Sequence, residues 1–334
     1  MERWERRAAP NAVYASTATA PHGKDGMDLS TPGTPQVFAC PVCGEPLERA
    51  DRSYACAHGH GFDIAREGYI NLHLAQYRRS KDPGYSKEMI AGRRNFFATG
   101  HYQPLADAVA ELIASYLPAT DDPAVVVDAG CGEGYYLRRL RHLLAEKGQE
   151  RSTVFVGMDI SKHGVRVAAK RDRAGLYAAA STYRMPIISD AADVLLTHFS
   201  PVSAADFRRA VKPGGVVLVG GPGEGHLYSF KELLYETPAE HEPADLLVNE
   251  PGFEPIAVHR IRYPLHLEGP GQVANLLLMT PFYWSVDDTT RSRLADTEDL
   301  YTEVDVTISA YRRTETEEAS VAAERNDRGD IEDW

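Results

Sequence analysis

Long hydrophobic runs are missing from this sequence of 334 residues. Apolar stretches such as residues 125–127 fall far short of the roughly 20 residues that a helix needs to cross a bilayer, which excludes a transmembrane protein. Positive charge is also scarce, because 36 Lys and Arg residues face 48 Asp and Glu residues and leave a net charge of −12. This balance excludes a uniformly basic nucleic-acid-binding surface, although a local basic patch is compatible with it.

Cysteine is sparse as well, with four residues in the whole chain. That number is too small for a secreted domain held by disulfides, and the first residues contain no apolar core of a signal peptide. We therefore expect a reduced, cytoplasmic protein. The chain is long enough for one large domain and a smaller module, and its 43% of hydrophobic residues is an ordinary globular value.

Composition divides the chain into five segments. Residues 1–35 are rich in Ala, Thr, Pro and Gly without apolar periodicity, which predicts a disordered arm. Residues 314–334 carry eight acidic residues against two arginines, half of the net charge, and predict an acidic disordered tail. Between them we expect a small cysteine-containing module over residues 36–75, a helical linker with a basic patch over 76–120, and a large domain over 121–313.

Short β-branched runs alternate with helical patterns in the large domain. The runs predict strands at residues 125–129, 153–159, 177–180, 193–199 and 216–220. Such alternation is typical of a parallel sheet with crossover helices. Val304, Val306 and Ile308 alternate with polar residues and predict a late antiparallel strand. We expect an α/β fold of the Rossmann-like type, with a mostly parallel sheet.

An Asp-x-Gly-x-Gly-x-Gly sequence lies between a predicted strand and a predicted helix. Glycines let a backbone turn sharply and approach a ligand where a Cβ atom would collide. The spacing is tighter than in dinucleotide sites and resembles motif I of S-adenosylmethionine-dependent methyltransferases. The resemblance implies that Asp128 orients the amino-acid end of the cofactor and that Asp159 accepts hydrogen bonds from both ribose hydroxyls. The loop residues beneath the cofactor are then Asp128, Gly130, Gly132 and Gly134.

Two alternatives stay open for this loop. It could be a tight strand-to-helix turn alone, or it could belong to a nucleotide-reducing enzyme. The second acid, Asp159, lies one helix and one strand after Asp128 and favours the methyltransferase. Residues 212–215, Lys-Pro-Gly-Gly before a strand, support it because this turn is frequent at the same place in methyltransferases.

Three of the four cysteines fall in the small module. Cys40 and Cys43 form a Cys-x2-Cys pair, and Cys56 and His60 follow with Cys-x3-His spacing. Four such ligands close a tetrahedral Cys3His site around zinc and leave no open position, so the zinc would be structural. His58 could compete for the fourth place, although only one residue separates it from Cys56, which makes it hard for both to bind the same metal ion. The other alternative is three unrelated reduced cysteines.

Further sequence blocks follow the cysteine module in order, at residues 61–72, 100–105 and 130–136. Together they resemble the bacterial 23S rRNA (guanine-N1)-methyltransferases, over roughly residues 36–313. Members of that family methylate a guanine in a hairpin loop near the peptide exit tunnel, and some confer macrolide resistance. Residues 78–84 and the glycine loop are more similar to the intrinsic-modification branch than to the tylosin-resistance branch.

The resemblance implies two cofactors, S-adenosylmethionine and structural zinc. It implies 23S rRNA as the partner and no membrane, and a homodimer is an open alternative to a monomer. Where its motifs match, the zinc ligands are Cys40, Cys43, Cys56 and His60, and the cofactor contacts include Tyr102, Gly132, Glu133 and His226. For His226 the alternative is a histidine at a helix start whose ring is satisfied by the backbone.

The segment Thr197–Pro201 departs from the family, which tends to show an aromatic residue followed by Ala-Pro near the target base. Guanine N1 carries a proton that must leave, and His198 could accept it as a general base. The alternative is a histidine satisfied in the core. Because the departure lies near the expected substrate, a methyltransferase of the same fold acting on a small molecule is a competing hypothesis. A non-catalytic RNA-binding protein is another, which the intact glycine loop disfavours.

Positive charge concentrates over residues 78–94, where six basic residues face two acidic ones. Such a patch is a candidate for phosphate contacts, and a solvated helix face is the alternative. Aromatic residues at 282–284 could stack a splayed-out base or pack in the core. The RNA-binding candidates are Arg78, Arg79, Lys81, Arg93, Arg94, Phe282 and Trp284.

Overall fold

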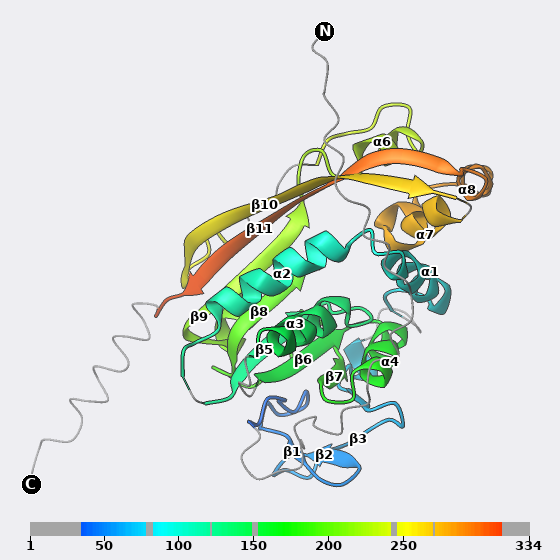
Figure 1. The fold of residues 1–334 in the computed structure, drawn as a ribbon. Coiled ribbons are helices and arrows are strands. Elements are labelled where there is room, and N and C mark those ends of the chain that lie inside the picture. The colour runs from blue at the N-terminus through cyan, green and yellow to red at the C-terminus, as the bar shows by residue number, and fades with distance from the viewer. Residues whose placement is uncertain are drawn as a thin grey trace, which may run out of the picture.

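The computed structural model describes residues 35–77, 83–120, 122–148, 153–241, 246–269 and 271–315. Its main sheet contains β4 (Tyr69–Asn71), β5 (Ala124–Ala129), β6 (Thr153–Asp159), β7 (Leu176–Ala179), β8 (Ala192–His198), β9 (Val211–Pro222), β10 (Phe253–Glu268) and β11 (Asp299–Arg313). The strand order is β10-β11-β9-β8-β5-β6-β7-β4 (Figure 1). Neighbours from β9 to β4 pair in parallel, whereas β11 runs antiparallel to both β9 and β10. The predicted mostly parallel sheet with a late antiparallel strand is confirmed.

Helices cover both faces of this sheet. They are α1 (Lys87–Ala98), α2 (Gln103–Tyr116), α3 (Tyr135–Glu146), α4 (Lys162–Arg171), α5 (Ala204–Ala210), α6 (Tyr228–Glu232), α7 (Gln272–Met279) and α8 (Asp288–Ala295), with 3-10 turns η1 (Ala75–Tyr77) and η2 (Pro281–Trp284). In Figure 1, α2 and α3 lie across one face of the central strands. Val126 of β5 packs in the core on that side, whereas Val125 and Val127 pack on the other side with Phe207 of α5. This alternation follows from the period of two along a strand.

The small cysteine-containing module forms its own antiparallel sheet, made of β1 (Glu48–Arg49), β2 (Ser53–Ala55) and β3 (Gly61–Asp63). The module is nevertheless continuous with the large domain. Phe38 and Leu47 belong to the same buried cluster as the β5 residues Val125 and Val127. Residues 69–71, within the expected module, add β4 to the edge of the main sheet beside β7. The module therefore shares a hydrophobic core with the large domain.

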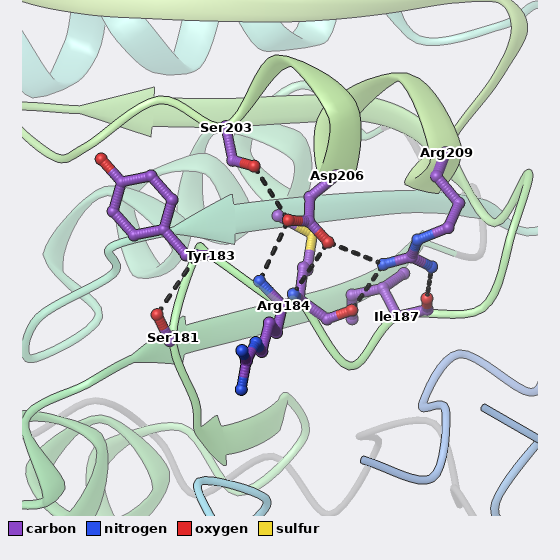
Figure 2. A network of polar contacts seen from close by, with 8 residues as sticks. Ser181, Tyr183, Arg184, Ile187, Ser203, Asp206 and Arg209 are labelled. Carbon is purple, nitrogen blue, oxygen red and sulfur yellow. Dashed lines mark hydrogen bonds and ion pairs between the residues drawn. The ribbon is translucent and has the colours of Figure 1, made fainter. Parts of the chain in front are cut away.

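The loop between β7 and β8 joins the two parts. Figure 2 shows Asp206 of α5 accepting hydrogen bonds from the backbone N–H of Arg184 and from the hydroxyl of Ser203, at 3.0 and 2.8 Å. Arg209 donates to the backbone carbonyl of Ile187 in the same network. Ile187 in turn forms a β-bridge with Phe38 of the module. The polar network thus holds the loop in the shape on which the module packs.

The strand β10 has no counterpart among the predicted strands, although it runs for 16 residues along the edge of the sheet.

The expected arm lies outside the described residues except for residue 35, and the expected tail lies outside them except for residues 314 and 315. Within the described parts, the structure contains no helix that is long and apolar enough to span a bilayer.

Candidate active site

The glycine loop leaves β5 and enters α3 at the point where β5 has β6 on one side and β8 on the other. Ligands of open α/β sheets bind at this switch point, outside the carboxyl ends of the strands. Gly130, Gly132 and Gly134 have φ values of +105°, +54° and +76°, a region that favours glycine. A Cβ atom on Gly130 would lie 2.1 Å from Oγ of Ser200, so the loop and the end of β8 approach as closely as glycine permits.

Two buried carboxylates lie at the ends of β5 and β6. Asp159 accepts hydrogen bonds from the backbone N–H of Gly132 at 2.9 Å and of Ser161 at 2.7 Å, which ties the loop to β6. Oδ2 of Asp128 has no hydrogen-bond partner among the described residues. Burial and then repulsion by Asp159 raise the pKa of Asp128 to about 7. An open acceptor beside a glycine loop fits the ammonium group of S-adenosylmethionine, and the role of Asp159 as the ribose acceptor stays a prediction.

A cavity of about 600 Å³ opens beside the loop, at the carboxyl ends of β8 and β9. Several of its lining residues are aromatic, among them Tyr102, Tyr136, Phe199, His226 and Phe282. The volume lies within the usual range for small-ligand sites. Flat aromatic walls of this kind suit a nucleobase taken out of its stack.

His198 is buried at the end of β8, with 3% of its surface exposed. Neither ring nitrogen has a hydrogen-bond partner among the described residues. Its ring lies 4.7 Å from that of Tyr136 and packs against the backbone of Gly220. Burial, and then the positive charge of Arg93, lowers the pKa of His198 to about 3. The imidazole is therefore neutral at pH 7 and has both nitrogens free.

His226 reaches the cavity from the segment between β9 and α6. Its Nδ1 accepts a hydrogen bond of 3.2 Å from the backbone N–H of Asp305, so the neutral ring carries its proton on Nε2. The ring lies 5.3 Å from that of Phe199. Burial, followed by repulsion from His241, lowers the pKa of His226 to about 3. The backbone contact expected of a helix-start histidine is present, and the ring still lines the cavity.

Tyr102 and Glu133, two expected cofactor contacts, occupy different surroundings. Tyr102 is buried with its ring 5.1 Å from that of Phe96, and it lines the cavity. The carboxylate of Glu133 is fully buried but pairs with Arg171 at 2.8 Å and with Arg138 at 3.5 Å. Glu133 thus fastens the glycine loop to α3 and α4, and Arg138 also donates a hydrogen bond of 2.7 Å to the backbone carbonyl of Glu133.

The expected RNA-binding residues separate into three groups. Arg78, Arg79 and Lys81 lie outside the described residues. Arg94 is exposed on α1, whereas Arg93, the preceding residue, lines the cavity. Phe282 lines the cavity as well, and Trp284 is 66% exposed on η2. Of these two aromatic residues, Phe282 therefore lies at the cavity and Trp284 lies on the surrounding surface.

The four expected zinc ligands converge. The ligand atoms of Cys40, Cys43, Cys56 and His60 all lie within 4.8 Å of one another. The sulfur atoms of Cys43 and Cys56 are 3.7 Å apart, and Nδ1 of His60 lies 3.6 Å from the sulfur of Cys40. Tetrahedral zinc with bonds of about 2.3 Å to sulfur and about 2.1 Å to nitrogen separates its ligands by about 3.8 and 3.6 Å. The group fits zinc with four protein ligands, and His58 does not belong to it.

Three features of the site escaped the sequence analysis. Phe199 takes a positive φ of +53° beside the cavity, a strained conformation of the kind that gathers at functional sites. Asp305 holds the segment of His226 by accepting from the N–H of Gly225 at 3.0 Å. Arg93 contacts the glycine loop. The only advance signal was the unusual segment 197–201, which contains Phe199.

Comparisons with known proteins find two family models that match different parts of the chain. Residues 38–81 match a zinc-ribbon family model described as "RlmA, N-terminal", and residues 120–242 match a methyltransferase domain. A Micromonospora griseorubida protein named among the 23S rRNA (guanine-N(1)-)-methyltransferases is 36% identical, over 74% of this chain and 87% of that protein. The 23S rRNA (guanine(748)-N(1))-methyltransferase of Streptomyces fradiae is 30% identical, over 81% and 93% respectively. The solved YcgJ structure from Bacillus subtilis matches with a TM-score of 0.42 and 12% identity, over 62% of this chain and 99% of that one.

Proposed function

Because the chain belongs to the family of 23S rRNA (guanine-N(1))-methyltransferases, we propose that it transfers a methyl group from S-adenosylmethionine to N1 of a guanine in a 23S rRNA hairpin loop. The observation that carries the proposal is the cavity of about 600 Å³, whose lining residues Ser200 and Arg93 lie against Gly130 and Gly132 of the glycine loop. A base in this cavity would lie next to the amino-acid end of a cofactor held by the loop.

The residues at the ends of β5 and β6 would hold the cofactor. Asp159 accepts hydrogen bonds from the ribose hydroxyls, and Asp128 faces the ammonium group with its open oxygen. Tyr102 contacts the cofactor from the cavity wall. S-Adenosylmethionine supplies a methyl group already activated on a sulfonium, so the contribution of these residues is mainly orientation.

The aromatic wall would hold the target guanine. Phe199 and Phe282 provide faces for stacking. His226 carries its proton on Nε2 and can donate a hydrogen bond to a guanine acceptor. The N1 proton becomes strongly acidic once N1 has gained the methyl group. A weak base such as His198, neutral with both nitrogens free, is then sufficient to receive the proton.

The RNA backbone would lie on the side of α1. Lys87 and Arg94 are exposed on this helix, and Arg78, Arg79 and Lys81 come shortly before it in the sequence. An rRNA substrate places the enzyme in the cytoplasm. A homodimer stays a prediction, which sedimentation equilibrium of the zinc-loaded chain would test.

Transfer of labelled methyl groups tests the proposal. The protein is incubated with labelled S-adenosylmethionine and either unmodified 23S rRNA or unmodified 16S rRNA. We expect label in 23S rRNA alone, and none with Asp159→Ala, which loses the ribose acceptor. Cofactor binding without incorporation into RNA would contradict the proposal. It would favour a small-molecule acceptor, for which the departure of residues 197–201 from the family pattern is the motive.

A further inference from the structure

Arg93 is held over the glycine loop by a rigid helix. The α1 helix lies between α7 and α4 in Figure 1, and it contacts both. Gly92 lets α1 pack tightly on α7, because a Cβ atom there would lie 2.6 Å from Cδ1 of Leu278. The neighbouring Arg93 then projects toward the loop, and its Nε lies 3.4 Å from the point that a Cβ atom of Gly132 would occupy.

The guanidinium of Arg93 makes no hydrogen bond or ion pair with the residues that the structure describes. Its Nε is buried without a hydrogen bond, and Arg93 forms no ion pair within the part of the chain that the structure describes. Its Cζ lies 4.9 Å from the centroid of the Phe97 ring, a cation–π contact. Leaving a charged donor unpaired in a buried position is unfavourable, and a bound anion would relieve it.

A positive and a negative side chain lie at different places around the glycine loop. Arg93 lies on the α1 side of Gly132, and Asp128 lies at the end of β5 with Oδ2 open. A ligand with a carboxylate and an ammonium on one carbon matches this arrangement, because each ligand charge would meet its opposite. A guanidinium can bind a carboxylate through two parallel hydrogen bonds, which adds orientation to the charge interaction.

We infer that Arg93 binds the carboxylate of the methionine moiety of S-adenosylmethionine. The inference rests on the proposed cofactor and removes Arg93 from the expected RNA-binding surface. An RNA phosphate is the competing partner. The position over the glycine loop favours the cofactor, since Nε is buried whereas the neighbouring Arg94 is exposed to solvent.

Binding of a ligand pair tests the inference without catalysis. The zinc-loaded wild-type protein, Arg93→Met and Arg94→Met are titrated calorimetrically with S-adenosylhomocysteine and with its decarboxylated analogue. We expect Arg93→Met to bind S-adenosylhomocysteine about 10- to 100-fold more weakly, as for a lost charged hydrogen-bond pair, and to bind the analogue as the wild type does. Arg94→Met should match the wild type with both ligands, and Arg93→Lys should retain part of the preference.

Three results would overturn the inference. Equal weakening of both ligands by Arg93→Met would mean that the side chain only shapes the pocket. Unchanged affinity for S-adenosylhomocysteine with weaker binding of 23S rRNA would assign Arg93 to a phosphate. Absence of S-adenosylhomocysteine binding by the wild type would refute the cofactor itself. A wild type that shows the expected carboxylate preference but methylates no rRNA would contradict the proposed function and leave the inference standing.

Discussion

Asp128 should destabilise the cofactor-free enzyme, and Asp128→Asn should therefore stabilise it. The pKa of Asp128 is raised from 3.8 to about 7, by burial first and by the charge of Asp159 second. A group whose pKa is raised on folding contributes stability below its unfolded pKa and loses this contribution as the pH rises through the folded value. The loss develops between about pH 4 and pH 7 and amounts to about 4 kcal/mol, at 1.36 kcal/mol per pKa unit.

The assay is urea-induced unfolding of the zinc-loaded, cofactor-free protein at pH 6, 7 and 8. We expect Asp128→Asn to be the more stable form at pH 8, and its advantage over the wild type to grow by about 1 kcal/mol between pH 6 and pH 8. Titrating groups that do not interact with Asp128 contribute equally to both proteins, so their contributions cancel in the difference. The same variant should bind S-adenosylhomocysteine more weakly, because it has lost the charge that faces the ammonium group.

The opposite result would be an Asp128→Asn variant that is no more stable than the wild type at pH 8. The difference in unfolding free energy between the two proteins would then also be independent of pH. Asp128 would then be stabilised in its ionised form by the fold itself. The open acceptor Oδ2 of Asp128 would then not be the group that binds the cationic end of the cofactor.

Two further predictions concern the zinc module and the RNA. Cys43→Ala should lose stoichiometric zinc, measured by metal analysis, together with most rRNA methylation, because three remaining ligands leave the closed site incomplete; a metal-free variant with full activity would disprove a structural zinc. Arg78→Ala combined with Arg79→Ala should weaken binding of 23S rRNA and lower the slope of log affinity against log salt by about 2, with cofactor affinity unchanged. Unaltered RNA affinity across a salt series would remove both arginines from the interface.

Local patterns predicted the central strands because β5, β6 and β8 are buried on both faces and read as continuous apolar runs. The edge strand β10 is half-exposed, mixes charged residues with apolar ones and contains Pro255 and Pro264, so its pattern resembles a loop. The three residues of β4 become a strand only through β7, more than 100 residues later in the chain. No local window contains that pairing.

Some residues of the candidate site could likewise be identified from local sequence, whereas others are placed by tertiary packing. The glycine loop, Asp159 and the zinc ligands are fixed by short spacings, which a sequence displays directly. The place of Arg93 depends on the packing of α1 against α7 through Gly92, and sequence alone grouped it with exposed basic neighbours. The positive φ of Phe199 is set by the approach of the β8 end to the loop, which is equally a tertiary feature.

Primer extension on 23S rRNA after treatment with the enzyme would locate the methylated nucleotide, because a methyl group on N1 of guanine blocks base pairing and arrests reverse transcriptase. We expect a single new stop, at a guanine in a hairpin loop, that depends on S-adenosylmethionine and disappears with Asp159→Ala. Treated rRNA that is read through without a new stop, by an enzyme that binds the cofactor, would contradict the proposed function.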